Sequence, residues 1–250
     1  MPDLIIFGRQ PVSEALLAGS PLRKIFLAQS TSGPNVSELL KAAEARHVPL
    51  QTRPRPELDR LAKTDKHQGV VALMPGVEYV DCDTILEKAR KDARGHKPAL
   101  MLLDSVEDPR NLGAILRVAD GAGLHGVLLT KRRCAEVTAV AVKTSAGAAF
   151  HLPIAQVTNL SVTIEYLKKQ GLWIVGLEAE AKENVYAMDA SLPLAIVMGS
   201  EGQGLHRLVR EKCDFLYRIP MAGKIASLNV ATAAAVVCFE MVRQRARGER

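Results

Sequence analysis

The stretch "ALMLLDSVEDPRNLGAILRVADGAGLHGVLLT" (Ala99–Thr130) decides the fold class of this chain. It opens with a continuous apolar run to Asp104, typical of a strand that is buried on both faces of a parallel sheet. A helix is expected over Arg110–Gly121, and a second apolar strand over Gly126–Thr130. A strand, a helix and a strand in this order predict an α/β sheet with a crossover helix.

The same alternation continues toward the C-terminus. Strands are expected over Trp173–Leu177 and Leu194–Gly199, and a closing helix is expected from about Ser227 into a basic tail. Ligands of such sheets bind at the carboxyl ends of the strands. The segment that follows Leu194–Gly199 is therefore a candidate binding loop.

A second, smaller α/β unit is expected before this region. Residues 1–74 alternate short elements, with helices predicted over Pro11–Gly19 and Asn35–His47 and strands over Lys24–Ala28 and Gly69–Met74. A Pro- and Gly-containing stretch and a charged run then follow as far as Lys97. We therefore expect a domain over residues 1–76, a linker over 77–97 and a second domain over 98–250.

The charge of the chain favours an anionic partner. Its 250 residues carry a formal net charge of +6, with a pI of about 9.2. Lys and Arg outnumber Asp and Glu by 15 to 12 in residues 1–97 and by 18 to 15 in residues 98–250, so the excess is spread over both parts. Nucleic acid is the first candidate. One Trp, four Tyr and five Phe argue against base-stacking surfaces of the RRM or OB type.

Cysteines and histidines provide no metal or disulfide pattern. The four cysteines are scattered without a CxxC pair, and the six histidines show no ligand spacing, so we expect no metal and reduced thiols.

The N-terminus lacks the features of a secretory signal, and the uncharged run Ile225–Phe239 is too short and polar to span a membrane. A cytoplasmic protein with no membrane association is expected.

The candidate loop itself reads "MGSEGQGL" (Met198–Leu205). A phosphate-binding loop requires a Lys followed by Ser or Thr after its last glycine, and no such pair follows Gly204. The glycine order, G-x-x-G-x-G, also differs from the dinucleotide fingerprint. Considered alone, the loop predicts a tight strand-to-helix turn.

Two further segments accompany this loop in a fixed order. "DPRNLGAILRVADGAG" (Asp108–Gly123) precedes it, and "IPMAGKIASLNVATAAAV" (Ile219–Val236) follows it. Together the three segments resemble motifs 1, 2 and 3 of the SpoU (TrmH-type) RNA ribose 2′-O-methyltransferases of the SPOUT superfamily. The resemblance implies a trefoil-knotted C-terminal domain with a mostly parallel sheet. "HQGVVAL" (His67–Leu73) and the elements before it resemble the family's L30e-like RNA substrate-binding domain.

The resemblance also implies S-adenosyl-L-methionine as methyl donor, without a metal. Gly199, Ile219 and Leu228 would offer it backbone contacts, although Ile219 and Leu228 also suit plain core packing.

The family's catalytic arginine corresponds to Arg117. Arg117 lies off the apolar stripe of its helix, and from the helix alone a surface pair with Asp120 is the favoured interpretation. A guanidinium normally stays protonated, so orienting the hydroxyl or stabilising charge suits it better than accepting a proton. The other expected site residues are Asn111, Glu201, Ser227 and Asn229. Ser227 and Asn229 are also good helix N-caps.

The resemblance implies methyl transfer to the ribose 2′-hydroxyl of a 23S ribosomal RNA nucleotide, with a guanosine as in the RlmB-type enzymes. Naked RNA and an assembling ribosomal particle are both open as the form of the substrate, and the family implies a homodimer. The alternatives are a tRNA ribose methyltransferase, an rRNA-modifying antibiotic-resistance enzyme and, from another class, a non-catalytic RNA-binding assembly factor. A nucleotide-dependent oxidoreductase is disfavoured by the glycine order.

Overall fold

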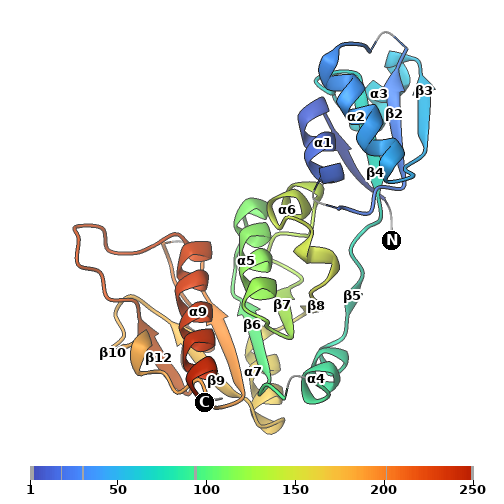
Figure 1. Ribbon diagram of the computed structural model, residues 1–250. Helices are drawn as coiled ribbons and strands as arrows, with labels where there is room; N and C mark the ends of the chain where they lie inside the picture. Colours follow the sequence, from blue (N-terminus) through green and yellow to red (C-terminus); the bar gives the residue numbers. More distant parts are fainter. Residues whose placement is uncertain (1–2, 18, 30, 93–94, 201, 249–250) are drawn as a thin grey trace.

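The chain forms two α/β units that are joined by an extended segment (Figure 1). The computed structural model describes residues 3–17, 19–29, 31–92, 95–200 and 202–248. The N-terminal unit has its own four-stranded sheet, and the rest of the chain builds an eight-stranded sheet. The α/β class predicted from the sequence is confirmed.

The N-terminal sheet is mixed. Its strands stand in the order β1-β4-β2-β3, and only the β2–β3 pair is parallel. The strands are β1 (Leu4–Phe7), β2 (Lys24–Ala28), β3 (Leu50–Arg53) and β4 (Val70–Met74), and the helices are α1 (Arg9–Leu17), α2 (Pro34–Ala45) and α3 (Arg55–Ala62). Helices α1 and α2 cover one face of the sheet. Leu58 of α3 packs against Phe26 and Val71 on the other face.

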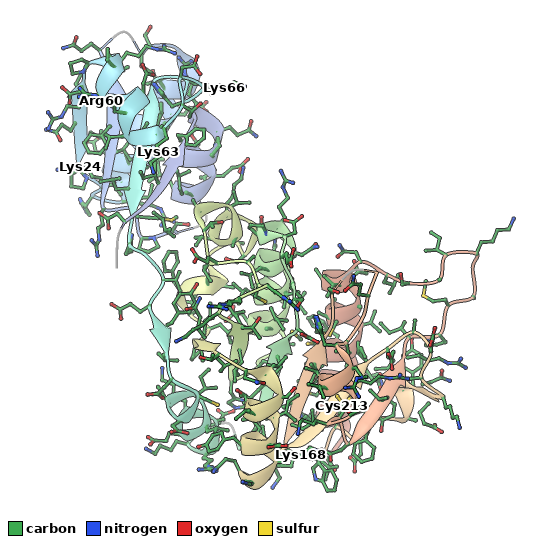
Figure 2. All side chains as sticks on the ribbon, turned by 180° about the vertical axis from the view of Figure 1, so that it is seen from behind. Lys24, Arg60, Lys63, Lys66, Lys168 and Cys213 are labelled. Carbon is green, nitrogen blue, oxygen red and sulfur yellow. The ribbon has the colours of Figure 1, made fainter. Side chains whose placement is uncertain are left out.

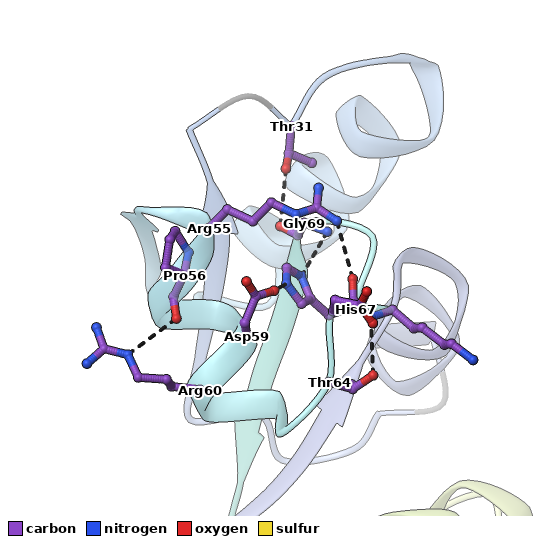
Figure 3. A network of polar contacts seen from close by, with 10 residues as sticks. Thr31, Arg55, Pro56, Asp59, Arg60, Thr64, His67 and Gly69 are labelled. Atoms are coloured by element: carbon purple, nitrogen blue, oxygen red, sulfur yellow. Dashed lines mark hydrogen bonds and ion pairs between the residues drawn. The ribbon is translucent and has the colours of Figure 1, made fainter.

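A buried histidine fixes the turn into β4 (Figure 3). The His67 side chain has no exposed surface, and its Nε2 lies 2.7 Å from Oδ1 of Asp59 in α3. Its Nδ1 accepts a hydrogen bond of 3.0 Å from the Gly69 main-chain N–H. Because Nδ1 accepts, Nε2 carries the hydrogen that is donated to Asp59. Gln68 Oε1 accepts from the Arg9 N–H at 3.2 Å, which joins this turn to α1.

The large sheet is parallel throughout, with strand order β10-β12-β9-β11-β6-β7-β8-β5. Its strands are β5 (Tyr79–Val80), β6 (Ala99–Leu103), β7 (Gly126–Thr130), β8 (Ile154–Val157), β9 (Trp173–Leu177), β10 (Glu183–Asn184), β11 (Leu194–Met198) and β12 (Phe215–Arg218). β6 and β11, the two most apolar, lie side by side at its centre, and all ten of their residues are buried.

Helices cover both faces of this sheet. They are α4 (Cys82–Arg90), α5 (Pro109–Gly121), α6 (Ala139–Thr144), α7 (Leu160–Lys169), α8 (Arg207–Arg210) and α9 (Val230–Gly248), with short 3-10 turns at Ala148–Phe150 and Val185–Ala187. Met101 and Leu103 of β6 belong to the core that contains α5, α6 and α9. Leu100 and Leu102 face the opposite core, formed with α4, α7 and α8. This alternation is the period of two expected of a strand with two apolar faces.

Several sequence-based boundaries agree with the structure, and others differ from it. Three predicted strands, Lys24–Ala28, Gly126–Thr130 and Trp173–Leu177, are confirmed at both ends. The closing helix begins at Val230, three residues later than Ser227, because the Asn229 side chain takes the N-cap position. Residues 77–97, expected as a linker, contain β5 and α4, and α4 buries Ile85, Leu86 and Ala89 in the core below the sheet.

One ion pair joins the two units where α1 lies beside α6. Nζ of Lys143 lies 2.8 Å from Oε2 of Glu14, with both side chains about half exposed. Among the helices described here, none is long and apolar enough to cross a membrane.

Candidate active site

The segment Gly199–His206, called the 199–206 loop, leaves the carboxyl end of β11 and folds back on itself. Ser200 and Gly204 exchange two main-chain hydrogen bonds of 3.1 Å each. A Cβ atom on Gly199 would overlap the Gly204 carbonyl group, and Gly202 and Gly204 have φ angles of +88° and +67°. Each glycine is therefore required, the first for close approach and the other two for left-handed backbone. The loop is closed by its own backbone and forms no open phosphate cradle.

A cavity of about 630 Å³, called cavity I, lies against this loop. All three predicted cofactor residues, Gly199, Ile219 and Leu228, line it, and so do Ser227 and Asn229. The rest of its wall is supplied by Leu177, Glu178, Ala179, Met198, Ser200, Gly202, Gly204, Met221, Ala226, Val230 and Ala233. The structure therefore brings together residues that the sequence separates by up to 56 positions, from Leu177 to Ala233.

A second cavity of about 490 Å³, called cavity II, adjoins the first. Ser200 and Val230 line both cavities, so they form the shared wall. Cavity II is otherwise lined by Ser105, Val106, Glu107, Asp108, Asn111, Arg133, Gln203 and His206. Its wall is rich in hydrogen-bonding groups, whereas cavity I presents mainly backbone and small apolar side chains.

Two helix N-termini meet between the cavities. The Asn229 amide donates from Nδ2 to Oδ1 of Asn111 at 3.0 Å, and Asn229 Oδ1 accepts from the Ala231 and Thr232 N–H groups of α9. At the start of α5, Asp108 accepts from the Arg110 N–H at 2.7 Å. Asn229 is thus both the helix cap and a link between motifs 1 and 3, so the two interpretations of this residue are compatible.

A histidine–aspartate pair at the edge of cavity II was not predicted from the sequence. Asp104 follows β6 directly and is 7% exposed in its side chain. Its Oδ1 accepts from His206 Nδ1 at 2.9 Å, and its Oδ2 accepts from the His206 main-chain N–H at 2.8 Å. The sequence signal was an acidic residue at the end of a buried strand. The adjacency of β6 and β11, which brings His206 to it, cannot be seen in the sequence.

Arg117 lies apart from these groups within the chain. It follows Asn111 by six residues on α5, which places it about 9 Å along the helix and about 120° around its axis. Its side chain is exposed and lines a third cavity of about 460 Å³, which includes Asp120, His151 and Phe239. In the portion of the chain that is described, Arg117 and Asp120 form no ion pair. As predicted, Leu112, Leu116 and Ala119 are fully buried on the opposite stripe.

Ser227, although it lines cavity I, is exposed. Glu201, the remaining predicted residue, lies outside the described residues.

The cysteines take no part in either cavity. Burial raises the pKa of the Cys213 and Cys238 thiols to about 12 and that of Cys82 to about 11. Neutral thiols of this kind are poor nucleophiles. Within the described ranges, no three His, Cys, Asp or Glu side chains are grouped so that they could hold a metal ion.

Comparisons with known proteins agree on one group of enzymes. Residues 98–239 match the SpoU rRNA methylase family, and residues 5–80 match the RNA 2′-O ribose methyltransferase substrate-binding family. A Bacillus subtilis (strain 168) protein assigned to the TrmH family of tRNA/rRNA methyltransferases is 41% identical over 240 residues, covering 96% of this chain and 95% of that protein.

Solved structures resemble the whole chain. The SpoU methyltransferase AviRb from Streptomyces viridochromogenes, in complex with the cofactor AdoMet, has a TM-score of 0.69 at 27% identity, covering 98% of this chain and 92% of that one. The AdoMet-bound rRNA methyltransferase from Sinorhizobium meliloti has a TM-score of 0.67 at 26% identity, covering 96% of this chain and 87% of that one.

Proposed function

The chain belongs to the SpoU rRNA methylase family, and from that premise we propose that this RNA 2′-O-methyltransferase modifies a guanosine ribose in 23S ribosomal RNA. It uses S-adenosyl-L-methionine as the methyl donor, as the AdoMet-bound relatives do. The observation that carries the proposal is the pair of adjoining cavities at the carboxyl end of the parallel sheet. One cavity is suited to the donor and the other to the nucleotide.

Cavity I fits S-adenosyl-L-methionine by its size and its wall. Its volume of about 630 Å³ is ample for a cofactor of this size. The donor has a neutral adenine and no phosphate, so it needs close backbone approach, and the three glycines in the wall, Gly199, Gly202 and Gly204, offer backbone without a covering side chain. Neither Lys nor Arg is among the described lining residues. When bound, the donor would supply an activated methyl group, and Gly199, Ile219 and Leu228 would hold it through their backbone.

Asn111, Ser227 and Asn229 are proposed to position the substrate ribose. Asn111 lines cavity II, Ser227 and Asn229 line cavity I, and the Asn111–Asn229 hydrogen bond joins the two sides. Amide and hydroxyl groups suit ribose hydroxyls because they donate and accept. Methyl transfer then depends on in-line placement of the hydroxyl oxygen. Glu201 remains a predicted member of this group.

Arg117 is proposed to act across a homodimer. Within the protomer it lies in the third cavity, beside Phe239, whose side chain is 50% exposed on α9. A second copy that packs on this face of α5 and α9 would cover Phe239 and bring its own site next to Arg117. There the guanidinium would stabilise charge on the ribose oxygen or hold the neighbouring phosphate.

The N-terminal unit, residues 1–76, is proposed as the L30e-like RNA-binding domain. Its match to a substrate-binding family supports this, and so does its charge. Lys24, Arg60, Lys63 and Lys66 lie on its surface (Figure 2). None of the four is in an ion pair with another described residue, so their charges are available to phosphates. A tRNA substrate is the alternative, because the relatives are assigned to tRNA/rRNA methyltransferases.

A methyl-transfer assay tests the proposal. The protein is incubated with methyl-labelled S-adenosyl-L-methionine and, separately, with total tRNA, naked 23S rRNA and partly assembled large-subunit particles. The labelled nucleotide is then mapped by its resistance to alkaline cleavage. We expect label at one guanosine of 23S rRNA. Label in tRNA alone would select the alternative substrate, and no label in any RNA would reject the function.

Arg117→Ala tests the role of the arginine. We expect it to bind S-adenosyl-L-methionine with normal affinity and to lose methyl transfer, because the donor cavity is untouched. Transfer at the normal rate would show that Arg117 is not part of the site.

A further inference from the structure

We propose that His206, held by Asp104, accepts the proton of the ribose 2′-hydroxyl in cavity II. The inference rests on the proposed function, because it assigns a residue to the methyl-transfer step.

The contacts of His206 fix which of its ring nitrogens is free. A carboxylate can only accept hydrogen bonds, so Nδ1, 2.9 Å from Asp104 Oδ1, must carry a hydrogen and donate it. Nε2 then keeps its lone pair. The second carboxylate oxygen accepts from the His206 main-chain N–H at 2.8 Å, so the backbone and the ring are both anchored to one buried side chain. The imidazole is 40% exposed, against 7% for Asp104.

The position of His206 is suited to this step. It lines cavity II, which shares Ser200 and Val230 with the donor cavity, and its Nε2 has no hydrogen-bond partner among the described residues. The two carboxylates of the same cavity are less suited. Asp108 caps α5, and Glu107 is exposed without a described hydrogen bond to orient it.

The other groups of cavity II fit a ribose and its phosphate. Arg133 is exposed there and forms no ion pair within the part of the chain that the structure describes. A guanidinium without a carboxylate partner is a good ligand for a phosphate group. Asn111 and Gln203 add amides that can bond to ribose hydroxyls. A nucleotide bound in this way has its ribose near the wall shared with cavity I.

The step balances with groups already named. The 2′-oxygen forms a bond to the methyl carbon while its proton moves to Nε2 of His206. The carbon–sulfur bond of the donor breaks, and its electron pair stays on the sulfur, which becomes a neutral thioether. The Asp104 carboxylate stabilises the imidazolium, which later releases its proton to water. Arg117 is not suited to this role, because a guanidinium does not give up its own proton to become an acceptor.

Single-turnover methyl transfer tests the proposal, with donor and RNA affinities measured alongside. In His206→Asn the amide can still donate to Asp104, but nothing replaces Nε2, so we expect transfer to fall by about 100-fold or more. Asp104→Asn keeps the ring but favours the opposite tautomer, so a similar fall is expected. Binding of donor and RNA should change little in both. The control is His96→Asn, which should leave the transfer rate unchanged. His96 also lies beside an aspartate, with its Nδ1 3.7 Å from Asp92 Oδ2, but at the opposite end of β6.

A spectroscopic measurement on the protein alone provides an independent readout. Nitrogen-15 NMR of the His206 ring should show hydrogen on Nδ1 and none on Nε2, and Asp104→Asn should reverse this. A normal transfer rate in His206→Asn, or hydrogen on Nε2 in the unaltered protein, would overturn the proposal. A failure of the proposed function is distinct, because the unaltered protein itself would then label no RNA.

Discussion

Two loops of this chain, one in each unit, combine a histidine–aspartate pair with a glycine that leaves no room for a side chain. The turn at residues 67–69, called the 67–69 loop, leads into β4, and the 199–206 loop leaves β11. In the first, a Cβ on Gly69 would overlap the Thr31 hydroxyl, and in the second a Cβ on Gly199 would overlap the Gly204 carbonyl.

The two pairs differ in which partner is buried. The His67 ring has no exposed surface and both of its nitrogens are bonded, to Asp59 and to the Gly69 N–H. In the other pair the carboxylate of Asp104 is buried, while the His206 ring borders a cavity with one nitrogen unbonded in the described structure. A fully bonded, buried imidazole can only support structure, whereas an anchored and half-exposed one can also react.

The largest effect is expected from His67→Ala. The change removes two buried hydrogen bonds and leaves a cavity, so the free energy of unfolding of the N-terminal unit should fall by about 4 kcal/mol. Hydrogen exchange of the β4 amides, measured by mass spectrometry, locates the loss. The exposed His47→Asn is the control, because Asn tolerates the left-handed backbone of this residue (φ +54°), and it should change stability by less than about 0.5 kcal/mol. If the β4 amides of His67→Ala exchange as slowly as in the unaltered protein, the His67–Asp59 pair does not have the structural role that distinguishes it from the Asp104–His206 pair.

Gly199→Val should weaken donor binding by about 100-fold, or about 2.7 kcal/mol. The overlap is with backbone, which cannot rotate away, so the 199–206 loop must open and cavity I must change shape. Isothermal titration with S-adenosyl-L-methionine measures the effect. Gly223→Val is the matched control, because a Cβ there meets nothing within 4 Å. Equal affinities in the two variants would show that the closed loop is not needed for binding.

Gly69→Ala should lower the free energy of unfolding by about 2 kcal/mol. This is smaller than the loss of binding free energy expected for Gly199→Val, because the obstacle is a side chain and not backbone. The residue has a φ angle of +79° and its new Cβ would meet Thr31, whose hydroxyl donates to the Gly69 carbonyl at 3.2 Å. Adding Thr31→Ala removes the obstacle, so the double variant should be about 1 kcal/mol more stable than additivity predicts. Denaturation of the four proteins measures the coupling, and strict additivity would contradict it.

Glu14→Gln should have the smallest effect, below about 1 kcal/mol, because the Glu14–Lys143 ion pair between the units is half exposed. The hydrogen bond from Lys143 lowers the pKa of Glu14 below its ordinary value of 4.5. The ion pair is therefore complete above about pH 4.5 and is lost as the pH falls through the lowered pKa. Small-angle scattering across this range should show the units separating in the unaltered protein, at a pH where Glu14→Gln shows no transition.

The sequence predicted the parts of the fold that depend on local pattern. Apolar runs such as Gly126–Thr130 identified buried strands, and the helix expected over Arg110–Gly121 is α5, which begins one residue earlier at Pro109. The start of α9 was placed too early, because Ser227 and Asn229 are equally good caps and only the folded chain selects Asn229. The helix α4 was missed because the charged surface of residues 82–90 hides its short apolar face.

For the candidate site, the sequence predicted only residues that lie within the three motifs. The motifs assign Gly199, Ile219 and Leu228 to the donor and Ser227 and Asn229 to the reacting ribose, and in the structure all five line cavity I. Their roles stay predictions. Their resemblance to a family provided this grouping, since residues separated by long stretches of sequence have no local pattern in common. Asp104 and His206 follow the neighbouring strands β6 and β11 and are 102 residues apart in the sequence, so local pattern could not reveal the pair. Arg117 was predicted from a motif position, and in the structure it lines a separate cavity.

The extended connection between β4 and β5 has a consequence for how RNA reaches the site. Only residues 75–78 separate Met74 from Tyr79, so the backbone between the units spans at most about 17 Å at ~3.4 Å per residue. Because the connection is short, an RNA bound by the N-terminal unit has a high effective concentration at the active site of the second unit, of the order of millimolar. RNAs long enough to contact both units would therefore bind more tightly than oligonucleotides that fill cavity II alone.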